Sequence, residues 1–117
     1  MQGTIPQASK SWQRWLAYSA IVFFYEAMGT FMLVCAVNSS NGDPTAVGLV
    51  LFVLLLIATP VSGGHFNPSV SIGVFINKDA TLQNFIQLLN MIAAQFFGAI
   101  VGNTFIYSIL ENNKDTP

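Results

Sequence analysis

The sequence has little charge. Asp, Glu, Lys and Arg make up 8% of its 117 residues, whereas about 25% is usual for a soluble domain, and 53% of the residues are hydrophobic. This composition excludes an ordinary soluble fold and indicates a membrane protein. The four basic residues are scattered and the net charge is -1. Nucleic-acid binding needs clustered Lys and Arg, so no nucleic-acid partner is expected.

Cysteine and histidine are equally scarce. The single cysteine, Cys35, lies in an apolar run, cannot form an internal disulfide, and is interpreted as a buried apolar residue. There is one histidine, His65, and the sequence has no paired carboxylates, no metal-ligand cluster and no phosphate-binding loop. The sequence therefore predicts no enzyme, no metal site and no cofactor.

Three long apolar runs predict transmembrane helices at about residues 15–37, 46–62 and 85–110. The first has Glu26 as its only charge and would reach roughly 34 Å as a helix, more than a bilayer core of about 30 Å. The second is just long enough to cross and ends near Pro60, and the third has residues to spare. The predicted fold is an all-α membrane protein with polar segments at residues 1–14 and 111–117.

A shorter apolar stretch, residues 68–76, lies between the second and third runs. As a helix it would be about 14 Å long, which is about half of the apolar layer. Asn67 suits the N-cap and Pro68 suits the first helical position. We therefore expect a re-entrant half-helix that begins near the middle of the membrane. Because irregular backbone at that depth must meet protein or water, residues 62–66 should line a polar cavity.

The basic residues predict the orientation. Lys10 and Arg14 precede the first run, Lys78 follows the short helix, and Lys114 alone lies beyond the third run. The positive-inside rule places the N-terminus on the cytoplasmic side, or the matrix side of an organelle, with the loop at residues 38–45 opposite. The positive end of the half-helix would then disfavour protons and metal ions in any pore built there.

Three motifs carry a family resemblance. "SGGHFNPSVSIG" resembles the first Asn-Pro-Ala motif of the aquaporin, or major intrinsic protein, family. "YEAMGTFMLV" resembles the family's Glu-x-x-Gly-Thr pattern in the first helix, and "AAQFFGAIVG" resembles its Ala-Gln-x-x-Gly-Ala segment in the third. They occur in family order over about residues 18–110. The resemblance implies the first of the family's two inverted repeats, with three spans and one re-entrant half-helix.

The resemblance also implies roles for single residues. Asn67 would donate its side-chain amide to permeating water at the pore centre. Four backbone carbonyls would accept hydrogen bonds along the half-pore: those of Gly63, Gly64, His65 and Phe66. Two glycines at those positions also permit a close, irregular backbone path.

Other residues would support this loop. By resemblance, Glu26 braces the loop from behind and Gln95 is a buried hydrogen-bonding strut, while Pro68 starts the half-helix. Gly98 and Gly102 form a GxxxG pair that permits close helix approach, and packing within the chain is its favoured use.

The sequence also departs from the family. Ser69 replaces the usual Ala after the Asn-Pro pair, and Val47 stands where the family often has an aromatic residue in its filter. A filter with Val47 would be wider and less polar on that wall. The second repeat, with its selectivity arginine, has no counterpart in the sequence.

One repeat cannot enclose the family's pore, because the second half-helix must meet the first head to head from an oppositely oriented repeat. One hypothesis is half of a water or small neutral solute channel that needs a complementary second half to conduct. The alternative is a non-conducting structural subunit of a larger membrane complex, and a further reading is that the sequence is part of a full-length channel. Besides the lipid bilayer, the first two require another membrane protein to cover the polar loop around Asn67.

Overall fold

The structure, a computed structural model, describes residues 7–112. Four helices follow one another: α1 (Gln7–Ser39), α2 (Pro44–Ser62), α3 (Pro68–Ile76) and α4 (Leu82–Asn112). No strand occurs in this described range. The long helices α1, α2 and α4 each contain a segment long and apolar enough to cross a membrane. The predicted all-α architecture of three long apolar helices and one short helix is confirmed.

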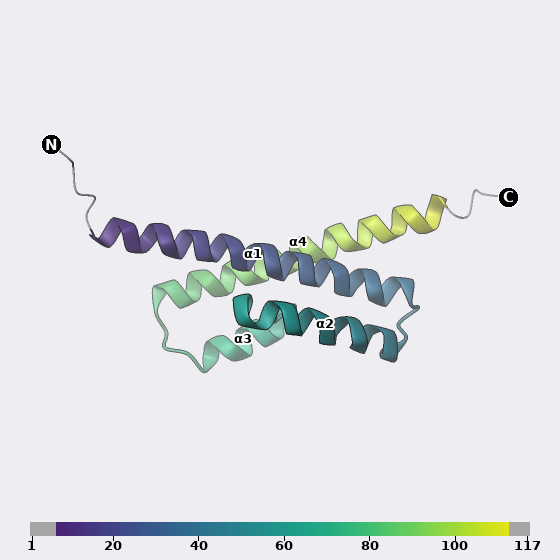
Figure 1. The fold of residues 1–117 in the computed structure, drawn as a ribbon, viewed down its shortest axis with the longest axis horizontal. Helices are drawn as coiled ribbons and strands as arrows, with labels where there is room; N and C mark the ends of the chain where they lie inside the picture. The colour runs from purple at the N-terminus through teal and green to yellow at the C-terminus, as the bar shows by residue number, and fades with distance from the viewer. Residues whose placement is uncertain (1–6, 113–117) are drawn as a thin grey trace.

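The long helices form a small bundle around α1. Figure 1 shows α1 and α4 running in the same direction and crossing near their middles, with α2 returning alongside α1. Helix α1 packs against both α2 and α4, and α3 packs against α4. The connection from α3 to α4 lies at the end of the molecule where α1 begins. The loop between α2 and α3 therefore lies midway along the long axis of the molecule rather than at an end (Figure 1).

The helices α1 and α4 are longer than the predicted spans, because polar residues continue them beyond the apolar runs. Helix α1 already includes the polar residues 7–14, and α4 starts at Leu82 and continues to Asn112. Hydropathy marks the edge of an apolar layer, whereas backbone hydrogen bonding continues through good helix formers such as Gln, Ala and Lys. Residues 1–6 and 113–117, the remainder of the two predicted polar segments, lie outside the described residues.

Side-chain caps fix the ends of the inner helices. Asp43 Oδ1 accepts a hydrogen bond from Ala46 N at 2.8 Å, and Pro44 occupies the first position of α2. At its other end α2 stops at Gly63, which has a left-handed conformation (φ 93°) and donates its N–H to Thr59 O at 3.2 Å. Asn67 caps α3, which covers the range expected for the short helix.

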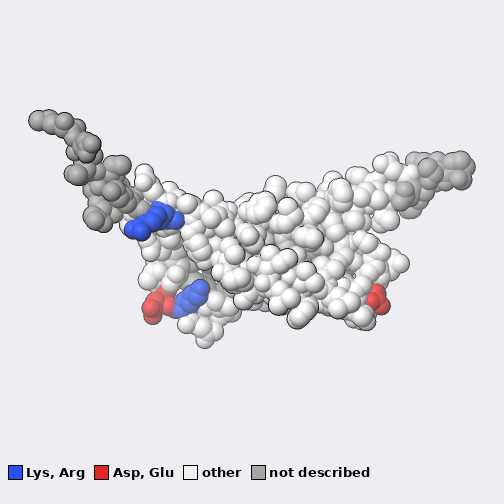
Figure 2. Space-filling view, in the orientation of Figure 1, with Lys and Arg blue, Asp and Glu red and all other residues white. Residues whose placement is uncertain are grey.

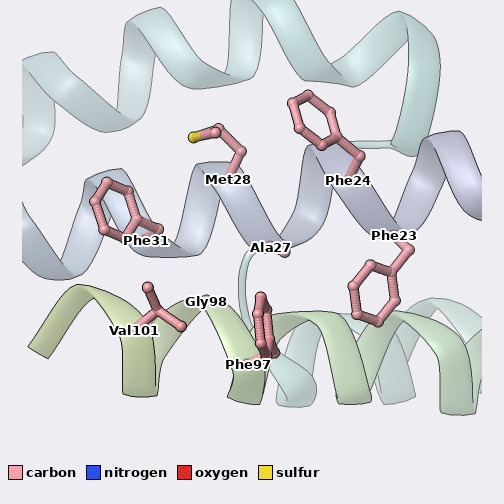
Figure 3. A pocket seen from close by; sticks show the side chains of 8 residues that line it. All are labelled: Phe23, Phe24, Ala27, Met28, Phe31, Phe97, Gly98 and Val101. Atoms are coloured by element: carbon pink, nitrogen blue, oxygen red, sulfur yellow. The ribbon is translucent and has the colours of Figure 1, made fainter. Parts of the chain in front are cut away.

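Two glycines bring α4 onto α1. A Cβ at Gly98 would lie 3.1 Å from the Cα of Ala27 and closer still to its carbonyl oxygen, and a Cβ at Gly102 would lie 2.9 Å from Phe31 O. Figure 3 shows the apolar side chains that flank this crossing and line a pocket of about 290 Å³, with Phe23 and Phe31 on α1 facing Phe97 and Val101 on α4. The GxxxG pair therefore packs within the chain.

Candidate functional site

Glu26 is the centre of a buried polar cluster. Its side chain, on α1, is completely buried. Oε1 accepts hydrogen bonds from Ser62 Oγ at 2.7 Å and from the backbone N–H of His65 at 3.0 Å. Oε2 accepts from the backbone N–H of Phe66 at 2.8 Å and from Gln95 Nε2 at 2.9 Å. A carboxylate offers about four acceptor positions, so Glu26 uses its capacity to hold the loop to α1 and α4.

The loop backbone takes an irregular path. Gly63 and Gly64 have φ values of 93° and 64°, and Phe66 has a φ of 49°. Glycine adopts this left-handed region freely, but a residue with a bulky side chain does not. The two glycines therefore let the chain leave α2, and Phe66 needs contacts that hold it in place.

The carbonyl groups of this loop are available for other partners. Within residues 7–112, no N–H or O–H group donates to the carbonyl oxygens of residues 63, 64, 65 or 66. Backbone oxygens at membrane depth require a hydrogen-bond donor from protein or water. These four consecutive carbonyl groups, directly before Asn67, therefore have acceptor capacity that the described residues do not use.

Ser71 joins the loop to α3 and α4. Its Oγ lies 3.0 Å from His65 Nδ1, 2.9 Å from Gln95 Nε2 and 3.3 Å from Asn67 O. Gln95 Nε2 can only donate and the Asn67 backbone carbonyl can only accept. All three contacts are therefore made together only when Ser71 donates to Asn67 O and His65 Nδ1 donates to Ser71. This arrangement orients the His65 ring.

Asn67 directly follows the four carbonyl groups of residues 63–66 and is exposed. Its Oδ1 accepts from Ser69 N at 2.9 Å, which caps α3. No acceptor among the described residues takes a hydrogen bond from its Nδ2. One half of this amide thus fixes the helix start while the other half remains a donor.

A polar pocket opens beside the loop. It has a volume of about 360 Å³, and its lining includes Gly63, His65, Lys78 and Gln87. Its wall also includes Tyr18, whose OH donates to Val61 O at 3.3 Å. Of residues 62–66, expected to line a polar cavity, Ser62, Gly63 and His65 line this pocket, whereas Gly64 and Phe66 do not.

Comparison with models of protein families shows which family the chain belongs to. The family model described as major intrinsic protein matches residues 7–116. The chain belongs to the major intrinsic protein family. As a member of this family with three apolar helices, it is an integral membrane protein.

Curated relatives of the chain include proteins named as aquaporins and as a glycerol uptake facilitator-like protein. The chain is 33% identical over 96 residues to glycerol uptake facilitator protein-like 6 of Lactiplantibacillus plantarum, which covers 75% of this chain and 43% of that protein. It is 29% identical over 121 residues to aquaporin PIP2-7 of Arabidopsis thaliana, covering 92% of this chain and 41% of the relative. The chain thus spans less than half the length of these relatives. No solved structure matches it significantly.

Val47, at the position that the resemblance assigns to the filter, lies apart from the loop. Val47 is in the first turn of α2, where its N–H donates to Asp43 O at 3.0 Å, and it is half-buried. The loop follows the last turn of the same helix, roughly 22 Å away at about 1.5 Å per residue. The structure therefore brings Glu26, Gln95 and the loop together but keeps Val47 at the other end of α2.

Sequence reasoning missed Ser71 and Gly29, and it missed the bond of Ser62 to Glu26. Ser62, expected only to line a polar cavity, donates to Glu26, and Ser71 bonds to Gln95. Gly29 makes room for the Phe66 ring on α1. A search for donors that could satisfy a carboxylate within an apolar run would have pointed to Ser62, whereas nothing in the sequence marks Ser71 or Gly29 as a contact of the loop.

Proposed function

We propose that this chain is one half of a channel for water or small neutral solutes, which conducts when an oppositely oriented second repeat supplies the other re-entrant helix. The observation that carries the proposal is the run of four carbonyl oxygens, at residues 63–66, that accept no hydrogen bond from the described residues and directly precede the exposed residue Asn67. The family membership supports the same function.

In this proposal the loop replaces the hydrogen bonds that a solute loses when it leaves bulk water. The carbonyl oxygens accept hydrogen bonds from its O–H groups, and Asn67 Nδ2 donates to its oxygen. The N-terminus of α3 carries partial positive charge, so it favours oxygen lone pairs and disfavours cations. Glu26 and Gln95 do not touch the solute but hold the loop open.

The proposed solutes are water and small polyols. Val47 is smaller and less polar than an aromatic residue, which favours a wider filter on this wall. The relatives are named aquaporins and a glycerol uptake facilitator-like protein. Water and glycerol are therefore the first two solutes to compare.

The proposed orientation places the start of α1 on the cytoplasmic or matrix side. The basic side chains visible in Figure 2 gather at the end where α1 begins and α3 leads into α4, as expected for Arg14 and Lys78. Asp43 precedes α2 at the opposite end of that helix. The polar pocket beside His65 and Lys78 would then be the cytoplasmic or matrix-side mouth of the half-pore.

The first test is to identify what accompanies the chain. Gently solubilised source membranes are separated on a native gel, and the band that holds this chain is analysed by mass spectrometry. A second Asn-Pro repeat in a small assembly, in the same or another polypeptide, is the expected result. A very large complex without a second repeat would contradict the channel and favour the structural subunit.

The second test measures permeation by the purified assembly in proteoliposomes, using osmotic shrinkage and glycerol uptake. Asn67→Asp keeps the oxygen that caps α3 but removes the N–H donors and adds charge. It should leave folding intact and lower permeability roughly tenfold. Asn41→Asp, the same substitution in the α1–α2 loop, is the control. Equal permeability of the two variants would contradict the role of Asn67.

A further inference from the structure

Phe66 has an unusual backbone conformation for its residue type. Within the described residues, Asn41 and Phe66 are the non-glycine residues with positive φ, at 52° and 49°. Asn tolerates the left-handed region because its short polar side chain can bond locally, but Phe has no such compensation. Something in the fold must therefore hold Phe66 in place.

The ring of Phe66 is held in a notch on α1. The residue is only 4% exposed and belongs to a buried cluster with Leu54 and Ala58 of α2. A Cβ added to Gly29 would lie 2.6 Å from Cζ of the ring and closer still to Cε1. Glycine at position 29 is therefore required for the ring to occupy this notch.

The backbone of Phe66 is held by the same helix. Its N–H donates to Glu26 Oε2 at 2.8 Å. Because residues three apart lie on one face of an α-helix, Glu26 and Gly29 present a hydrogen-bond acceptor and a notch on the same face of α1. Phe66 is thus fixed at two points, its amide and its ring.

Asn67 directly follows Phe66 in the chain, so its position depends on how Phe66 is held. Its backbone is extended, with φ at -151°, and its Oδ1 caps α3 through Ser69 N. A rotation about the Phe66 backbone would move Asn67 and α3 together relative to α1, so the Asn67 amide would be presented in another direction. We propose that Phe66 is a positioning residue, whose ring in the Gly29 notch holds the loop in the conformation that presents the Asn67 amide. Its consequence for permeation rests on the proposed function, whereas the positioning itself does not.

The test separates the ring from the backbone conformation. Phe66→Gly adopts a positive φ freely but has no ring, Gly29→Ala keeps the ring but fills the notch, and Phe66→Leu partly refills it. Gly48→Ala is the control, because a Cβ there has nothing within 4 Å. The readout is hydrogen exchange of the His65 amide, measured by NMR on the full chain in neutral detergent micelles, since this amide joins the loop to α1 by donating to Glu26 Oε1.

We expect Phe66→Gly and Gly29→Ala to speed His65 exchange at least about tenfold, with exchange at Val22 in the middle of α1 unchanged. Phe66→Leu should keep part of the protection and Gly48→Ala all of it. Unchanged His65 exchange in both Phe66→Gly and Gly29→Ala would overturn the proposal. The proposal would also be overturned if exchange at Val22 were accelerated as much as exchange at His65, in Phe66→Leu as well as in the other two variants. The ring would then matter only to overall folding.

Water permeability of the purified assembly distinguishes this inference from the proposed function. Loss of His65 protection together with loss of permeability supports both. Loss of protection with unchanged permeability supports the positioning role and contradicts the role of Asn67 in the pore. A wild-type assembly that conducts nothing contradicts the proposed function and leaves the exchange result as the test of positioning.

Discussion

Gln95 Nε2 donates a hydrogen bond to Glu26 Oε2 at 2.9 Å, and this bond joins residues 69 positions apart in the sequence. The same amide nitrogen lies 2.9 Å from Ser71 Oγ. One side chain of α4 therefore connects α1 to the short helix. Because Gln95 and Glu26 are both buried, the loss of either partner leaves polar atoms that water does not readily reach.

Replacing Gln95 should destabilise the bundle. Gln95→Leu removes the donor to both Glu26 and Ser71, and the free energy of unfolding should fall by about 2–3 kcal/mol, typical for a lost hydrogen bond to a buried charged group. The measurement is unfolding by sodium dodecyl sulfate in mixed micelles, followed by circular dichroism. Gln83→Leu, at an exposed position of the same helix, is the control. Equal stability of the two variants would show that the buried bond adds nothing.

Replacing Glu26 tests the centre of the cluster. Glu26→Gln keeps the shape of the side chain but turns one acceptor into a donor, which then faces another N–H or O–H group. The expected loss is about 3 kcal/mol in the same unfolding measurement, and the loop amides of His65 and Phe66 should exchange faster. Glu111→Gln, at the exposed end of α4, is the matched control. A stability close to that of the control would contradict the bracing role.

The sequence predicts the helices well because their signals are local. The apolar runs identify α1, α2 and α4, and the Asn-Pro pair places the start of α3, whose N-cap is Asn67 in the structure. The ends of α1 and α4 are less accessible, because polar residues continue both helices beyond the apolar layer. At the start of α4, Thr81 Oγ1 accepts from Asn84 N at 3.2 Å, a cap that hydropathy does not reveal.

The site is predictable only in part. The resemblance points to Glu26, Gln95 and the loop, and the structure shows that these residues share one hydrogen-bonded cluster. The resemblance does not reveal Ser71 as the group between His65 and Gln95, because nothing in the sequence distinguishes this serine from others in apolar helices. The contact between Phe66 and Gly29 is also hidden, since it depends on how two helices and a loop meet in space.

The crossing of α1 and α4 should be sensitive to a single methyl group. In Gly98→Ala the new Cβ meets backbone atoms of Ala27, which cannot move aside as a flexible side chain would. The helices must separate, and overpacking of this kind should cost about 1–3 kcal/mol of unfolding free energy. Gly48→Ala, where a Cβ has open space inside α2, should be neutral or slightly stabilising. Equal free energies of unfolding for the two variants would contradict a close contact between α1 and α4 at Gly98.

The last prediction concerns how the chain crosses the membrane. If α2 spans the bilayer, the loop before it and the connection after α3 lie on opposite sides, since α3 returns the chain to the end where α1 begins. Ser40→Cys and Asp79→Cys, each in a Cys35→Ala background, place a single thiol in these two segments. An impermeant maleimide added outside intact cells, or outside intact organelles, should label Ser40→Cys but should label Asp79→Cys only after the membrane is opened. Labelling of both from outside would place them on one side, and α2 would then not cross. Labelling of Asp79→Cys alone would reverse the proposed orientation while leaving α2 as a span.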